Sequence, residues 1–185
     1  MIESSVSNTY ANSDCSIWFQ LGKIEVNSVN NSFNYAVMNA FCVVFGTYST
    51  ANFTFCDIYN NSSPGQGIFW GGPFEMKFCQ YVQNYQCADI DALLTRGTGK
   101  VESSIFLSNI CYKLFQNSNI KAYNCFMKNN TEISKSPGSI LSTVNLIPFR
   151  FDKFIENCSY LNNPSCIFLN HLSLNDLFKM FHLYS

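Results

Sequence analysis

A short motif recurs along the chain and constrains its fold more than any other feature. Each copy has a cysteine or serine, a large apolar residue two places later and an asparagine three places after that. The copies follow one another at steps of 23, 25, 21 and 33 residues, and they are Cys56-x-Ile58-x-x-Asn61, Cys79-x-Tyr81-x-x-Asn84, Ser104-x-Phe106-x-x-Asn109, Cys125-x-Met127-x-x-Asn130 and Cys158-x-Tyr160-x-x-Asn163. A weaker copy, Val26-x-Ser28-x-x-Asn31, precedes them. Because so short a unit cannot bury its own apolar face, the repeat predicts stacked coils that share one core.

The residues around each motif indicate strands and not helices. An apolar residue followed by a polar one, such as Met76 and Lys77, precedes most copies, which is the alternation of a half-buried strand. The glycines and prolines between residues 64 and 73 would interrupt a helical repeat. We therefore predict an all-β fold, a right-handed, single-stranded parallel β-helix of six or seven coils, with the hand taken from the preference of parallel crossovers.

In such a fold, equivalent side chains of successive coils lie directly above one another. The cysteine is expected to point inward as a small buried hydrophobic residue. The asparagine suits a turn because it tolerates the left-handed conformation, and its amide can bond to the asparagine of the next coil. The predicted ladder contains Cys56, Cys79, Ser104, Cys125 and Cys158 in one column and Asn61, Asn84, Asn109, Asn130 and Asn163 in the other.

The chain divides into three regions by its pattern. Residues 1–14 are polar and are expected to form an irregular tail or first cap, and residues 15–166 form the β-helix. Residues 167–185 are expected to cap the open end, in a helix that begins after Ser173 and has an apolar face. The chain shows neither a signal peptide at its start nor an apolar run long enough to span a membrane as a helix.

Composition argues against several classes of function. Only 12% of the residues are charged and the net charge is −1, so nucleic acid is not an expected partner. The nine cysteines contain no C-x-x-C pair, and we expect buried free thiols, no metal site and no cofactor. Both histidines, His171 and His182, fall in the predicted cap, away from any arrangement typical of a catalytic triad.

One pair of acids keeps an enzymatic alternative open. Asp89 and Asp91, in "CADIDALL", would lie on the same side of an extended strand, where they are candidates for general acid and base or for a calcium site with Glu75 or Asp57. The alternative is a solvated strand face. Tyr59, Phe126 and Trp70 are candidates for outward aromatic residues that stack on sugars, against the alternative that they belong to the core.

The segments "NCFMKNN", "ENCSYLNN" and "IYNNSSPGQGIFW" resemble the F-x-x-N and G-G-A-I repeats of chlamydial-type polymorphic membrane proteins, and the related repeats of trichomonad surface proteins. The resemblance covers roughly Ile24 to Asn163, and the second motif occurs only as "GQGIF" and "PGSIL". It implies a β-helix displayed at a cell surface or outside the cell.

We therefore expect a non-enzymatic, adhesin-like interaction module that binds a protein or a glycan. The open ends of its stack are expected to permit end-to-end self-association. The alternative function is a polysaccharide lyase or glycoside hydrolase that uses Asp89 and Asp91.

Overall fold

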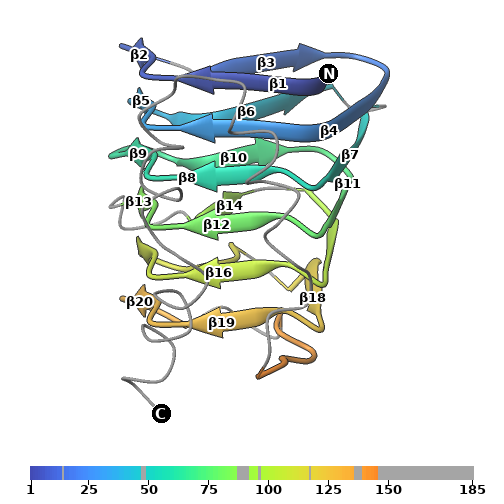
Figure 1. The fold of residues 1–185 in the computed structure, drawn as a ribbon, viewed down its shortest axis with the longest axis vertical. Coiled ribbons are helices and arrows are strands. Elements are labelled where there is room, and N and C mark those ends of the chain that lie inside the picture. The colour runs from blue at the N-terminus through green and yellow to red at the C-terminus, as the bar shows by residue number, and fades with distance from the viewer. Residues whose placement is uncertain are drawn as a thin grey trace. The chain divides into compact units, whose positions relative to one another are not determined.

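The chain forms a parallel β-solenoid of about five turns (Figure 1). The computed structural model describes residues 1–13, 15–46, 49–86, 92–95, 97–116, 118–135 and 139–145. The five or so turns are fewer than the six or seven coils that the sequence predicts. The last motif copy, with Cys158 and Asn163, and the predicted cap at 167–185 lie outside the described residues.

A ten-stranded sheet supplies two sides of each coil, and the long strand β4 (Lys23–Ser32) belongs to both. On the first side, the start of β4 pairs with β7, and we call this side the first stack. It continues through β7 (Thr50–Thr54), β11 (Phe74–Lys77), β15 (Gly99–Glu102) and β18 (Ile120–Tyr123). The second stack contains β1 (Ile2–Ser7), the end of β4, β8 (Asp57–Tyr59), β12 (Gln80–Val82), β16 (Ile105–Leu107) and β19 (Phe126–Lys128).

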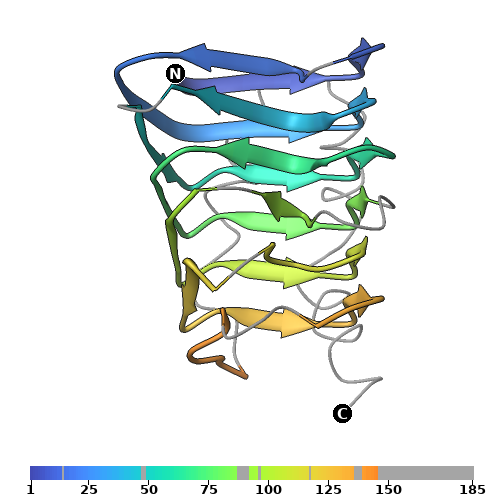
Figure 2. The ribbon, with the colours of Figure 1, turned by 180° about the vertical axis from the view of Figure 1, so that it is seen from behind.

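Two smaller sheets close the coil. The third stack contains β2 (Tyr10–Ala11), β5 (Tyr35–Ala36), β9 (Ser62–Ser63), β13 (Tyr85–Gln86), β17 (Ile110–Cys111) and β20 (Thr131–Glu132). The fourth stack contains β3 (Ile17–Gln20), β6 (Asn39–Phe45), β10 (Gly67–Gly71) and β14 (Leu94–Thr95). Figure 2 shows the fourth stack from its own side, in front of the second.

The core runs through the middle of the coils because inward positions are apolar in every turn. In the first stack, the register aligns Val26, Phe53, Met76, Val101 and Ala122, all of them buried. In the second stack, the rings of Tyr81 and Phe106 stack with centroids 5.3 Å apart and an interplanar angle of 8°. Burial of one such ring contributes about 2 to 3 kcal/mol to folding, so the core supplies much of the stability.

Two corners of the coil repeat the same unusual backbone conformation. At the corner between the first two stacks, the left-handed residues are Glu3, Ser28, Phe55, Phe78, Ser103 and Asn124, with φ between 46° and 54°. At the corner between the second and third stacks they are Asn8, Phe33, Asn60, Gln83, Ser108 and Asn129, with φ between 50° and 57°. Each residue that is not glycine costs about 1 kcal/mol in this conformation. The stacking of the coils therefore stabilises corners that an isolated coil would not keep.

A chain of asparagine side chains follows the second corner, as the repeat predicts. The backbone N–H and the Nδ2 of Asn61 both donate to Oδ1 of Asn84, at 3.0 and 3.2 Å. Asn84 donates in the same way to Asn109, and Asn109 to Asn130, at distances of 2.9 to 3.0 Å. The stacking of buried asparagines is confirmed. One detail is wrong: the left-handed residue is the one before the asparagine, for example Asn60 before Asn61.

The cysteines follow the first corner, and they do more than fill space. Cys56, Cys79 and Cys125 are fully buried, free thiols, and each donates to the carbonyl two residues earlier, at 3.3 to 3.6 Å. In the coil that has serine at this position, the Ser104 hydroxyl donates to the Glu102 carbonyl at 3.0 Å. Burial raises the pKa of the Cys125 thiol to about 11, which keeps it protonated as a donor. The cysteine and serine coils therefore share a small side chain with a hydrogen-bond donor at this position, whereas the register places the buried Val29 there in the β4 coil.

The first coils differ from the sequence prediction in two ways. The weak copy at Val26, Ser28 and Asn31 is wrong by three residues, because Asn31 pairs with Ile58 and it is Asn34 whose backbone N–H donates to Asn61 Oδ1 at 3.0 Å. Asn31 consequently occupies an inward core position, and its amide has no hydrogen-bond partner within the described residues.

The start of the chain is also more regular than its polar composition predicts. Strand β1 pairs in parallel with β4, and β2 with β5, so both belong to the first coil. Val6 lies beside the inward Asn31, whereas Ser5 and Ser7 lie on the other side of the strand. The serines are tolerated because their side of β1 faces away from the core.

Candidate functional site

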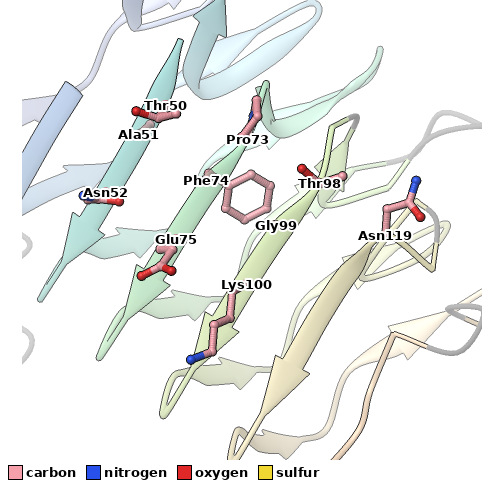
Figure 3. Close-up of a pocket in the computed structure, with 10 residues that line it drawn as sticks. All are labelled: Thr50, Ala51, Asn52, Pro73, Phe74, Glu75, Thr98, Gly99, Lys100 and Asn119. Atoms are coloured by element: carbon pink, nitrogen blue, oxygen red, sulfur yellow. The ribbon is translucent and has the colours of Figure 1, made fainter. Parts of the chain in front are cut away.

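A groove lies on the outer face of the first stack, where β7, β11 and β15 begin (Figure 3). Its volume is about 530 Å³, and it is lined by Thr50, Ala51, Asn52, Pro73, Phe74, Glu75, Thr98, Gly99, Lys100 and Asn119. Three of its polar residues, Asn52, Glu75 and Lys100, are equivalent positions of successive coils. The parallel register therefore places an amide, a carboxylate and an ammonium group in a row.

The floor of the groove depends on one glycine. Gly99 is the register partner of Phe74, and a Cβ atom at residue 99 would overlap the Phe74 ring. The ring occupies the space that a side chain would take, and it also packs against Phe69 with centroids 4.9 Å apart. The ring lies on the inner side of the sheet and is 4% exposed, so the accessible surface of the groove is formed by the polar side chains and the backbone around Gly99 (Figure 3).

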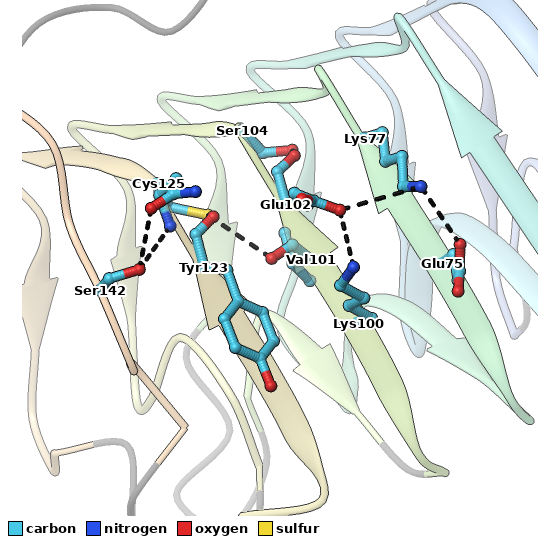
Figure 4. A network of polar contacts seen from close by, with 10 residues as sticks. Glu75, Lys77, Lys100, Val101, Glu102, Ser104, Tyr123, Cys125 and Ser142 are labelled. Carbon is cyan, nitrogen blue, oxygen red and sulfur yellow. Dashed lines mark hydrogen bonds and ion pairs between the residues drawn. The ribbon is translucent and has the colours of Figure 1, made fainter.

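Charged residues continue from the groove along the same face and form a network (Figure 4). Glu102 Oε2 lies 2.8 Å from Lys100 Nζ and 3.8 Å from Lys77 Nζ, and Lys77 Nζ lies 3.7 Å from Glu75 Oε2. The hydrogen bond from Lys100 lowers the pKa of the Glu102 carboxyl, and the same bond raises the pKa of Lys100. Both side chains are therefore charged at neutral pH, and the network compensates each charge.

The groove and its network offer binding chemistry. Hydroxyl and amide groups form hydrogen bonds in either direction, and the ion pairs are internally balanced. The side chain of Asn52 is oriented by a hydrogen bond from its Nδ2 to Glu25 Oε1, at 3.2 Å, which leaves its Oδ1 as the acceptor toward the groove. This combination suits a neutral ligand that is rich in hydroxyl groups.

The predicted acidic pair cannot be placed with this site. Asp89, Asp91 and the candidate cation Arg96 lie outside the described residues. Of the acids suggested as their neighbours, Glu75 lines the groove on the first stack, whereas Asp57 belongs to β8 in the second stack. Burial raises the pKa of Asp57 to about 7. Lys77 belongs to the charged network.

The two aromatic candidates whose side chains are described, Tyr59 and Phe126, do not form a common platform. Phe126 is buried, with 7% of its surface exposed, and Tyr59 packs edge-on against Phe33 at 5.3 Å. The side chain of Trp70 lies outside the description.

The sequence prediction missed most of the groove residues, although the sequence contains a signal for them. A polar residue lies four places before the cysteine or serine of four motif copies, and these residues are Asn52, Glu75, Lys100 and Lys121. The repeat therefore predicts a polar row one residue before the apolar strand position.

In the described part of the chain, no three histidine, cysteine, aspartate or glutamate side chains come close enough to hold a metal ion. The same residues contain no helix with the length and apolar character needed to cross a membrane.

No protein family model matches the sequence, and comparisons with curated proteins and with solved structures found no significant similarity.

Proposed function

We propose that this chain is a non-enzymatic interaction module that uses the groove on its first stack to bind a glycan. The observation that carries the proposal is the set of hydroxyl and amide groups in the lining, among them Thr50, Asn52 and Thr98. Sugars present many hydroxyl groups, so a site for them needs hydrogen-bond donors and acceptors. A stack of hydrogen-bonded coils also holds these groups in fixed positions without a ligand.

Display at a cell surface or outside the cell is part of the proposal, and the repeats' resemblance to those of surface proteins supports it. We also propose a right-handed winding of the coils, from the general preference of parallel crossovers. End-to-end association remains a prediction, which sedimentation velocity at several protein concentrations tests.

The binding test uses a panel of neutral oligosaccharides and measures affinity by calorimetry. Asn52→Ala removes one polar group from the groove, and Asn27→Ala is its matched control, since Asn27 is an exposed asparagine on β4 of the same stack outside the groove. We expect Asn52→Ala to weaken binding and Asn27→Ala to leave it unchanged.

A second pair of variants tests a hydroxyl group of the lining. Thr98→Ala removes that hydroxyl and should weaken binding. Thr54→Ala, on β7 of the same stack outside the groove, serves as its control. Equal binding by all four variants would refute this site, and cleavage of the oligosaccharide would refute the non-enzymatic reading.

A further inference from the structure

The groove carries no net charge from its own ionised residues. Its lining contains Glu75 and Lys100, one of each sign. The two charged residues that contact them from outside the lining, Lys77 and Glu102, are again one of each sign. Anionic sugars, such as uronic acids, bind where a cation is available to the carboxylate, whereas neutral sugars need no such cation.

Glu102 is the ion-pair partner of Lys100, the cation of the groove lining. It lies between Lys77 and Lys100 and accepts the short contact of 2.8 Å from Lys100 Nζ (Figure 4). Lys100 is held from a second side by the ring of Tyr123, whose centroid is 5.7 Å from Nζ. A carboxylate that entered the groove would have to compete with Glu102 for Lys100 and would approach the negative charge of Glu75.

We infer that Glu102 is a positioning residue that sets the specificity of the groove: it holds Lys100 in an ion pair, so that the groove accepts neutral oligosaccharides and rejects uronates. The inference rests on the proposed function. It predicts that Glu102→Gln, which keeps the size of the side chain and removes its charge, leaves Lys100 available to an anionic ligand.

The experiment compares two ligands that differ only at C6. One is β-1,4-linked mannotetraose, and the other is the corresponding tetramannuronate, which has a carboxylate in place of each CH2OH group. The wild-type protein should bind the neutral form and bind the uronate much more weakly. Glu102→Gln should bind the uronate about five-fold more tightly than the wild type, which is the size of one exposed ion pair.

Two further readouts separate specificity from a structural effect. The gain of Glu102→Gln should disappear at high salt, and the double variant Glu102→Gln/Lys100→Gln should lose it. Glu3→Gln changes the net charge equally at a distant exposed position, and it should leave both affinities at the wild-type level.

The possible failures are distinguishable. Wild-type binding of the uronate as tight as that of mannotetraose would overturn the role of Glu102 and leave the groove as a glycan site. The same holds if Glu102→Gln shows no gain, or if Glu3→Gln gains equally. If no variant binds a neutral oligosaccharide from the panel or a uronate, the proposed function fails, and this inference fails with it.

Discussion

Replacement of Asn84 by alanine tests how much the asparagine chain contributes to stability. The Asn84 side chain accepts two hydrogen bonds from Asn61, at 3.0 and 3.2 Å. Its Nδ2 donates to the carbonyl of Ile58 at 2.8 Å and to Oδ1 of Asn109 at 3.0 Å. The residue is 1% exposed, so water cannot replace these partners without a local opening of the coils.

The expected loss follows from the groups that are left without a partner. After the change, Asn61 Nδ2 keeps its bond to the Asn31 carbonyl at 2.9 Å, and Asn109 Oδ1 keeps the backbone N–H of residue 84 at 3.0 Å. The Asn61 N–H loses the side chain that served it, whereas the Ile58 carbonyl still faces the Val82 N–H in the parallel ladder of β8 and β12. A buried polar group without a partner costs about 1 to 3 kcal/mol, so we expect a loss of about 1 to 3 kcal/mol.

The assay is urea unfolding followed by far-ultraviolet circular dichroism. The control is Asn60→Gly, because Asn60 is the neighbouring asparagine, is exposed and has φ of 50°, a conformation that glycine adopts without strain. We expect this control to stay within about 1 kcal/mol of the wild type.

Hydrogen exchange supplies a local measurement, since stacked coils do not always unfold in one step. Exchange of the Asn61 amide should accelerate in Asn84→Ala and stay slow in the control. A loss below about 1 kcal/mol, the worth of one ordinary hydrogen bond, would refute the reasoning. Equal losses in the two variants would refute it as well.

Three other substitutions test single features of the coil by urea unfolding. Asn31→Ile should stabilise the protein by about 1 to 3 kcal/mol, because it removes a buried amide without a partner beside Ile58, and a loss of stability would show that the amide is satisfied. Ser104→Ala should cost about 1 to 3 kcal/mol, since the Cys79 N–H donates to the Ser104 hydroxyl at 3.1 Å, and a cost no greater than that of Ser104→Cys would contradict this role. For Asp57, burial raises the folded-state pKa from the usual 3.8 to about 7, so the folded state loses stability as the pH rises from about 4 to about 7. Asp57→Asn should therefore be more stable than the wild type at pH 8, by about 1 to 2 kcal/mol for this partly exposed side chain, and equal to it at pH 4; the opposite pH trend would refute the burial of the carboxyl.

The motif spacing predicted the stacking because a residue type that recurs once per coil marks one position in the cross-section. It placed the asparagine contacts from Asn61 to Asn130 correctly. It failed in the first long coil, where Asn27, Asn30, Asn31 and Asn34 lie close together and the letters alone do not select the corner residue. Only the pairing of Asn31 with Ile58 decides the register there.

The repeat pattern did not predict the groove, for a different reason. Its floor depends on Gly99 and Phe74, which are 25 residues apart in sequence and in register across two strands. The pattern shows that these positions face the same way, but not that a ring fills the place of an absent side chain. A groove depends on the side-chain volumes of neighbouring coils, whereas the periodicity of the sequence indicates only to which side of the strand each side chain points.

The one-way arrangement of the asparagine amides makes the coils interchangeable parts. From Asn61 to Asn109, each of these residues donates to the next in the same manner, whatever the length of the loop that separates them. A duplicated or deleted coil would meet its new neighbours with the same bonds as before. Genes for such a protein are therefore free to grow or shrink by whole turns, while the groove, which needs three particular turns in order, restricts where that growth is tolerated.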